Sequence, residues 1–254
     1  MCIRDRLEKL TYCDVSNESF PYLSSQYIDI GYARVLAIRV TYVGELGWEL
    51  YVPADQAAHV FEEILAAGAD HGLKLCGLHA MDSCRIEKGF RHFGNDITDE
   101  DHVLEAGLGF AVKTEKLGGA DFLGREAVLR KKETGLERRM MQFCLTDPSA
   151  HLHHNEPILR DGKIVSYVTS ANYGHAIGGS VGMGYVPCAA AGEKPADMLS
   201  SRYQIEIAGR LYDATASLKP MYDPKSLRPK AGTDTDEGAP DERAQRNHDK
   251  TQAA

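Results

Sequence analysis

Apolar residues recur along this chain in two patterns, one typical of β-strands and one typical of α-helices. Residues 34–41 are mostly β-branched and aliphatic, which predicts a strand. Residues 54–67 carry apolar side chains at helical spacing, with acidic residues off the apolar stripe, so we expect a helix there. Two further helices are predicted over residues 79–88 and 125–133, each closed by a glycine.

Beyond residue 140 the pattern changes to short strands and turns. Residues 157–170 predict a hairpin around Asp161-Gly162, and residues 203–216 predict another around Ala208-Gly209. Several short strands at this spacing are typical of a small barrel or sandwich.

The predicted helices and strands divide the chain into an α+β part, residues 7–136, and an all-β part, residues 137–229. Residues 1–6 fit poorly with the segment after them and resemble a spurious leader, so they are left out of the fold prediction. We then expect the chain to be a piece of a longer protein, with the α+β part incomplete at its N-terminus. Residues 230–254 are polar and charged, which predicts a disordered tail.

Composition excludes several classes of function. The net charge of −8 argues against a nucleic-acid partner, because binding phosphates needs a basic face. No apolar run approaches the roughly 20 residues of a membrane span, so no membrane association is expected. The six cysteines are scattered without a Cys-x-x-Cys pair, which favours reduced thiols and a cytoplasmic location over disulfides or zinc.

Residues 42–51 (YVGELGWELY) concentrate the candidate chemistry. Aromatic rings can stack on a flat heterocycle, and a carboxylate can accept two parallel N–H donors. Glycine lets the backbone turn sharply or come close to a ligand. These groups suit a planar, donor-rich ring such as a pterin. On composition alone, however, a hairpin with surface acids and buried rings is the favoured interpretation.

A sequence match that extends beyond residues 42–51 favours the pterin site over the ordinary hairpin. Together with residues 82–89 (DSCRIEKG) and 93–97 (FGNDI), residues 42–51 resemble the folate-binding aminomethyltransferase family of the glycine-cleavage system. The form of residues 42–51 is more similar to one branch, the C-terminal half of the FAD-dependent dimethylglycine and sarcosine dehydrogenases. The resemblance spans about 7–229 and implies an α+β folate-binding region followed by a C-terminal β-barrel.

The resemblance also implies site residues. In the relatives the second Glu of the motif holds the N3–H and 2-amino group of the pterin, and its neighbours lie against the folate. The corresponding residues here are Tyr42, Glu49, Leu50 and Tyr51. For either tyrosine alone, core packing with a satisfied hydroxyl remains an equal alternative. Glu45, in the turn of the motif, is a weaker candidate.

Three downstream positions refine the resemblance. Phe110 stands where the dehydrogenase branch often has a tyrosine that contacts folate, so stacking would survive and a hydroxyl hydrogen bond would not. Arg91 is a candidate to face the cavity. Met81 stands where the glycine-cleavage enzymes have a folate-contacting arginine, and the dehydrogenase branch is apolar there too. This departure favours the dehydrogenase branch.

The implied function is one-carbon capture. In the parent enzyme, FAD bound by an N-terminal domain would oxidise an N-methyl amine, and tetrahydrofolate would take the carbon as 5,10-methylenetetrahydrofolate. No Gly-x-Gly-x-x-Gly fingerprint is present, so the FAD site is expected upstream of this chain. The resemblance also implies that the catalytic base lies upstream, because the glycine-cleavage relatives carry the aspartate that helps activate the folate amine in their first domain. Alternatives are a stand-alone aminomethyltransferase or related demethylase, and a non-catalytic folate-binding or scaffolding module.

Two further motifs are less informative. His151, His153 and His154 could form a metal site, but they lack carboxylate or thiolate partners at a suitable spacing, so no metal is assigned. The glycine cluster at residues 174–184 matches a pattern in the relatives' β-domain, where glycines serve turns and close packing.

Overall fold

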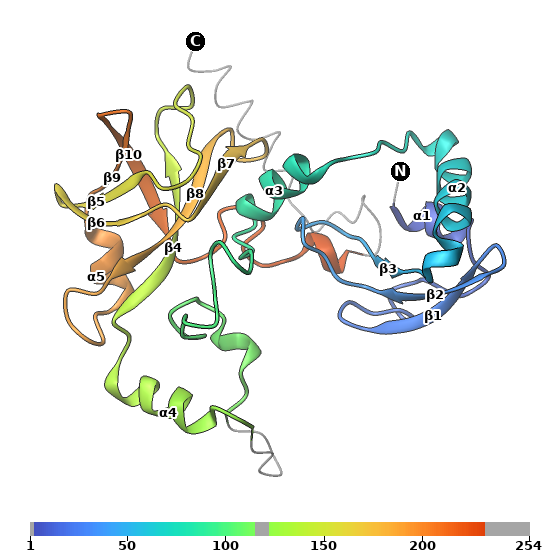
Figure 1. The fold of residues 1–254 in the computed structure, drawn as a ribbon, viewed down its shortest axis with the longest axis horizontal. Coiled ribbons are helices and arrows are strands. Elements are labelled where there is room, and N and C mark those ends of the chain that lie inside the picture. Colours follow the sequence, from blue (N-terminus) through green and yellow to red (C-terminus); the bar gives the residue numbers. More distant parts are fainter. Residues whose placement is uncertain (1–2, 115–121, 232–254) are drawn as a thin grey trace. The chain divides into compact units, whose positions relative to one another are not determined.

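The computed structural model describes residues 3–114 and 122–231, which divide into two compact units (Figure 1). The first unit combines the described residues up to Met81 with those from Lys225 onward. The second unit runs from Asp82 to Pro224. The expected disordered tail lies almost entirely outside the described residues.

The first unit is a small antiparallel sheet in the order β1-β2-β3, with helices on its inner face (Figure 1). Its strands are β1 (Ser25–Ile30), β2 (Ala33–Ile38) and β3 (Glu49–Tyr51). Its helical elements are α1 (Ile3–Glu8), η1 (Ala54–Gln56), α2 (Ala57–Gly68), η2 (Ala69–His71) and η4 (Arg228–Lys230). The strand predicted over residues 34–41 and the helix predicted over residues 54–67 are confirmed.

Alternation along β2 produces the core of this unit. Ala33, Val35 and Ala37 are buried and pack with residues of β1, α1 and α2, while the residues between them point to the outer face. Leu7 of α1 belongs to this core. The helix that carries it includes part of residues 1–6, so leaving those residues out of the predicted fold was wrong for this helix.

The second unit begins with helices and ends in a large sheet. The helices are α3 (Leu78–Glu87), whose first turn precedes the boundary, η3 (Gly109–Ala111), α4 (Arg125–Thr134) and α5 (Pro195–Ser200). The strands are β4 (Arg138–Leu145), β5 (Pro157–Arg160), β6 (Lys163–Tyr167), β7 (Ser170–Gly174), β8 (Gly179–Pro187), β9 (Tyr203–Ile207) and β10 (Arg210–Ser217). The helices predicted over residues 79–88 and 125–133 are confirmed, whereas the short α5 was not predicted.

All pairings of this sheet are antiparallel, in the order β6-β5-β9-β10-β4-β8-β7. Strand β6, at one edge, also contacts β8 near the other edge, so the sheet curls on itself. Both predicted hairpins are confirmed, and their turns use Asp161-Gly162 and Ala208-Gly209 at positive φ. At Gly184 a Cβ would lie 2.6 Å from the Tyr167 carbonyl oxygen, so glycine permits this close packing.

A buried ion pair joins α3 to the loop after it and to β7. The guanidinium of Arg85, 2% exposed, donates to Asp96 Oδ2 (2.5 Å), to Asp82 Oδ1 (2.7 Å) and to Ser170 Oγ (2.8 Å). Asp96 is 1% exposed and also accepts from the Thr169 hydroxyl. Asp82 and Arg85 are three residues apart on one helix, a spacing that brings such side chains together. Asp96 instead comes from the loop after α3, 11 residues further along the chain.

A second charged cluster fixes the start of β4. Glu105, 5% exposed, accepts from Lys131 Nζ at 2.8 Å, from Arg138 Nε at 3.1 Å and from the Glu137 N–H at 3.1 Å. Burial opposes ionisation of this carboxyl, but the three donors outweigh burial and hold the pKa of Glu105 below its usual value. The ionised form therefore stabilises the folded state.

This shift predicts a pH-dependent cost for Glu105→Gln. Because the folded pKa is depressed, the stabilisation is complete above the unfolded pKa of about 4.3 and is lost as pH falls through the folded value. We expect Glu105→Gln to lower the free energy of unfolding by about 1–3 kcal/mol at neutral pH. In urea unfolding, the difference from wild type should close below a pH of about 4. Glu133→Gln on exposed α4 should show no such difference, and a pH-independent cost for Glu105→Gln would contradict the assignment.

Candidate outer-face site on the three-stranded sheet

The chain between β2 and β3 is a tight loop that requires its glycines. The Thr41 hydroxyl accepts from the N–H groups of Val43 (3.2 Å) and Gly44 (3.0 Å), and Gly44 adopts a φ of +81°. Strand β2 ends at Ile38 before this turn, three residues earlier than the predicted end at residue 41. Glu45 in the loop lies 3.5 Å from Arg228 in an ion pair, so it has a structural partner.

Arg39 anchors the other side of this loop. It is 1% exposed, donates to the Phe20 carbonyl oxygen at 2.7 Å, and places its guanidinium 5.8 Å from the centre of the Trp48 ring. Trp48 also packs against Phe20, with ring centroids 6.1 Å apart. Since Trp48 is fixed toward the interior, strand alternation turns the next side chain, Glu49, outward.

The three residues of β3 consequently divide between two faces. Leu50 packs against the core, whereas Glu49 and Tyr51 are exposed. The Tyr51 hydroxyl donates to Glu49 Oε2 at 3.0 Å. This hydrogen bond, with the charge of Glu49, raises the pKa of Tyr51, so the phenol keeps its proton. Glu49 Oε1 makes no hydrogen bond within the described residues and can accept one from a ligand.

The register of the sheet extends this face into a platform of three rows. The first row joins Ser25, Ile38 and Glu49. The second joins Tyr27, Leu36 and Tyr51. The third joins Asp29 and Arg34. We call these eight residues the outer-face platform. It presents the Glu49 carboxylate at one end, two half-exposed phenols around an aliphatic centre, and at the other end the Arg34 guanidinium opposite a second carboxylate, that of Asp29.

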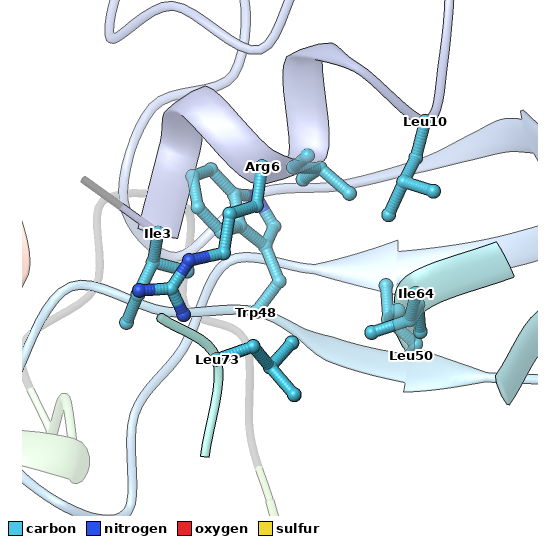
Figure 2. A pocket seen from close by; sticks show the side chains of 8 residues that line it. Ile3, Arg6, Leu10, Trp48, Leu50, Ile64 and Leu73 are labelled. Carbon is cyan, nitrogen blue, oxygen red and sulfur yellow. The ribbon is translucent and has the colours of Figure 1, made fainter. Parts of the chain in front are cut away.

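An apolar pocket of about 140 Å³ lies on the inner side of the same unit (Figure 2). Figure 2 shows side chains from α1, α2 and β3 converging on it. It is lined by Ile3, Arg6, Leu7, Leu10, Trp48, Leu50, Ile64 and Leu73. No carboxylate lines this pocket, so it lacks an acceptor for the donor edge of a pterin. Because the Leu50 side chain lines this inner pocket, Leu50 can contact a ligand on the outer face only through its backbone.

The remaining predicted residues have different surroundings. Tyr42 is half-buried in the loop before β3. Arg91 and Phe110 belong to the second unit, where Phe110 lies in η3 and is 81% exposed. Strand pairing therefore brings only Glu49 and Tyr51, among the predicted side chains, onto the outer face of the small sheet.

Arg91 is positioned against the segment that leads to Phe110. Its Nη1 donates to the Gly89 carbonyl oxygen at 2.6 Å, and its Nη2 lies 2.6 Å from where a Cβ on Gly107 would be. Gly107 adopts a φ of +72°, so this contact requires glycine. Burial, opposed by the charge of Asp96, lowers the pKa of Arg91, which nevertheless stays cationic.

Sequence reasoning missed most of the outer-face platform. It selected Glu49 and Tyr51 but not Tyr27, Arg34 or Leu36, which are brought beside them by strand pairing. Alternation along residues 25–38 was a usable signal for which residues share a face. The register that aligns the strands was not visible in the pattern.

Two negative findings apply to the described residues alone. Among residues 3–114 and 122–231, no three His, Cys, Asp or Glu side chains are grouped so that they could hold a metal ion. Over the same ranges, no helix combines the length and apolar character that crossing a bilayer requires.

Family models cover most of the chain. Residues 3–116 match the model described as the GCVT N-terminal domain. Residues 138–223 match the glycine cleavage T-protein C-terminal barrel domain. Together these matches confirm the predicted fold class, a mixed helix-and-sheet aminomethyltransferase-like domain followed by a barrel domain.

Individual proteins agree with the family models. The chain is 41% identical over 225 residues to 4-methylaminobutanoate oxidase (formaldehyde-forming) of Paenarthrobacter nicotinovorans, covering 89% of this chain and 26% of that protein. It is 38% identical over 229 residues to mitochondrial sarcosine dehydrogenase of Mus musculus, covering 89% and 24%. Mitochondrial dimethylglycine dehydrogenase of Mus musculus is also similar. The chain thus spans about a quarter of the length of these relatives.

A solved structure supports the same fold. The crystal structure of glycine cleavage system aminomethyltransferase T from Bartonella henselae matches with a TM-score of 0.64 at 26% identity. The match covers 75% of this chain and 50% of that protein.

Proposed function

Because the chain belongs to the glycine-cleavage T-protein family, we propose that it is the tetrahydrofolate-binding module of a larger, flavin-dependent N-methyl amine dehydrogenase. In this proposal residues 7–136 form the folate-binding region and residues 137–229 the barrel. The observation that carries it is the outward-facing Glu49, placed beside Tyr51 on the outer-face platform.

Each platform residue has a chemical role in this proposal. The Glu49 carboxylate accepts two hydrogen bonds from the N3–H and 2-amino group of the pterin, a charge-assisted pair. Tyr51 donates to Glu49 Oε2, which orients the carboxylate, and offers its ring face to the ligand. Leu50 contributes its backbone. Tyr42, in the loop before β3, is proposed as a further folate contact. The roles of Arg91 and Phe110 stay predictions of the family resemblance.

The reaction then needs little from these residues beyond positioning. An N-methyl amine oxidised to an iminium (R₂N⁺=CH₂) gives its carbon to N5 and N10 of tetrahydrofolate. The products are 5,10-methylenetetrahydrofolate, the demethylated amine R₂NH and one proton. Holding N5 near the iminium carbon converts a bimolecular step into an intramolecular one and limits loss of formaldehyde. The oxidation is assigned to FAD in an N-terminal part of the parent protein, since this chain carries no dinucleotide fingerprint.

The substrate class comes from the relatives. Their names specify methylaminobutanoate, sarcosine and dimethylglycine, which are all N-methyl amino acids. We therefore assign an N-methylated amino acid to the parent protein.

A stand-alone aminomethyltransferase is the second candidate, favoured by the match to the Bartonella henselae protein. Met81, in place of the arginine of that branch, favours the dehydrogenase.

The test uses the full-length natural protein. We expect calorimetry to detect one tetrahydrofolate bound per chain. We also expect oxidation of an N-methyl amino acid to yield 5,10-methylenetetrahydrofolate when folate is present and formaldehyde when it is absent. Folate binding without any amine oxidation would favour the aminomethyltransferase or a non-catalytic module. Absence of folate binding would refute the proposal.

A further inference from the structure

We propose that Arg34, held against Tyr27, binds the glutamate carboxylates of the folate whose pterin is held by Glu49. This inference rests on the proposed function and adds a second anchoring point to the same site. It also fixes the direction in which the ligand lies across the outer-face platform.

The outer-face platform holds Glu49 and Arg34 at opposite ends, as the two polar ends of a folate require. Arg34 and Ile38 lie on one face of β2, and Ile38 pairs with Glu49 on β3. Four residues of strand separate the two rows by roughly 13 Å. In folate, a rigid aminobenzoyl ring separates the pterin from the glutamate, so its two polar ends are also held apart. The Arg34 row therefore lies where the tail of a folate extending along β2 would end.

The surface between the two ends suits the aminobenzoyl ring. Leu36 occupies the centre of the middle row, with Tyr27 and Tyr51 as its cross-strand partners. The two tyrosines are 58% and 54% exposed, which is unusual for a row of large apolar side chains. Bound folate would cover this surface. Aromatic and aliphatic side chains around a ring contribute stacking and apolar burial.

Charge fixes the direction. The pterin edge carries N–H donors and needs an acceptor, which Glu49 supplies. The glutamate carboxylates need cationic donors, which the fork of Arg34 supplies. In the reverse direction, the ligand's carboxylates would face Glu49, and like charges repel. At the other end the Asp29 carboxylate lies opposite Arg34, so there the ligand's carboxylates meet a cation as well as an anion, whereas at Glu49 they would meet only the anion. The orientation with the glutamate at the Arg34 row is therefore favoured.

Arg34 is preorganised and accessible. Its guanidinium lies 4.8 Å from the centre of the Tyr27 ring, a cation–π contact that limits its conformations. Asp29 is its cross-strand partner, yet within the described residues Arg34 forms no ion pair. Its donors therefore point to solvent, where a carboxylate can reach them.

The experiment compares two ligands on the full-length protein by calorimetry. Tetrahydrofolate carries the glutamate, and tetrahydropteroate lacks it. We expect Arg34→Gln to weaken tetrahydrofolate binding about five-fold, the upper size of a solvent-exposed charge pair, and to leave tetrahydropteroate binding unchanged. Arg34→Lys should keep part of the preference, because it retains the charge but not the fork. Arg210→Gln, an exposed strand arginine of the second unit, should leave both affinities unchanged.

The outcomes separate the two proposals. If Arg34→Gln weakens both ligands equally, or neither, the assignment of Arg34 is wrong while folate binding stands. If wild-type protein binds neither ligand, the proposed function itself fails and this inference fails with it. Circular dichroism of each variant distinguishes lost contacts from lost structure.

Discussion

An Asp96→Ala variant is expected to lose about 3–5 kcal/mol of its free energy of unfolding, the cost of leaving a buried charge without its partner. Arg85 would remain 2% exposed and would lose its buried counter-charge, keeping the neutral acceptors Phe90 and Ser170 and the half-exposed carboxylate of Asp82. The Thr169 hydroxyl would lose its acceptor as well. Such a loss is a large share of the stability of an ordinary domain, so urea unfolding at low temperature is the suitable measurement.

The molecule provides a matched control for this prediction. Asp82 also accepts from Arg85, at 2.7 Å, but its side chain is 38% exposed. Asp82→Ala should cost only about 0–1 kcal/mol, as for a solvent-exposed pair. Equal, small costs for both variants would show that the buried pair does not hold α3 to the sheet. The double variant Arg85→Met/Asp96→Leu should recover much of the loss, because it removes both charges.

Glu49→Gln in the full-length natural protein is expected to weaken tetrahydrofolate binding by roughly 2–4 kcal/mol, or about 30- to 1000-fold. The amide keeps the shape of the side chain but replaces one acceptor oxygen with a donor, so one N–H of the pterin would face another N–H. The measurement is calorimetry, with the melting temperature recorded for the same protein. Since Glu49 is exposed in the free chain, its replacement should leave the melting temperature nearly unchanged.

Glu45→Gln is the control within the same motif. Glu45 has the same charge and lies four residues earlier, but its carboxylate lies 3.5 Å from Arg228 in an ion pair. We expect folate affinity to stay near the wild-type value. Unchanged affinity in Glu49→Gln, or an equal loss in both variants, would contradict the specific role of Glu49 in the outer-face site.

Local structure could be predicted closely from the sequence because its causes are local. The helices near residues 57–68, 78–87 and 125–134 follow from apolar spacing and closing glycines. In the two hairpin turns Asp161, Gly162 and Gly209 are residue types that tolerate positive φ, whereas Ala208 adopts it at a steric cost. The family could also be predicted, since residues 42–51 carry an uninterrupted motif. The short helix α5 was missed because six residues give little periodicity.

The candidate site was predictable only in part. Glu49 and Tyr51 were selected from the motif, and alternation explains why they share a face while Leu50 does not. Arg34 lies 15 residues before Glu49 in sequence and gave no signal of its own. Antiparallel pairing of its own strand, β2, with β3 brings Arg34 onto the same platform as Glu49.

By itself, the sequence determined the elements, their turns, the family and the acid at the centre of the proposed site. The tertiary structure alone decided which side chains share the outer face of the small sheet, and that Arg85 is neutralised by Asp96 rather than mainly by Asp82. The physical reason is range: periodicity and turn chemistry act between residues a few positions apart. Strand register and the burial of a charge depend instead on contacts between segments that only the packed chain brings together.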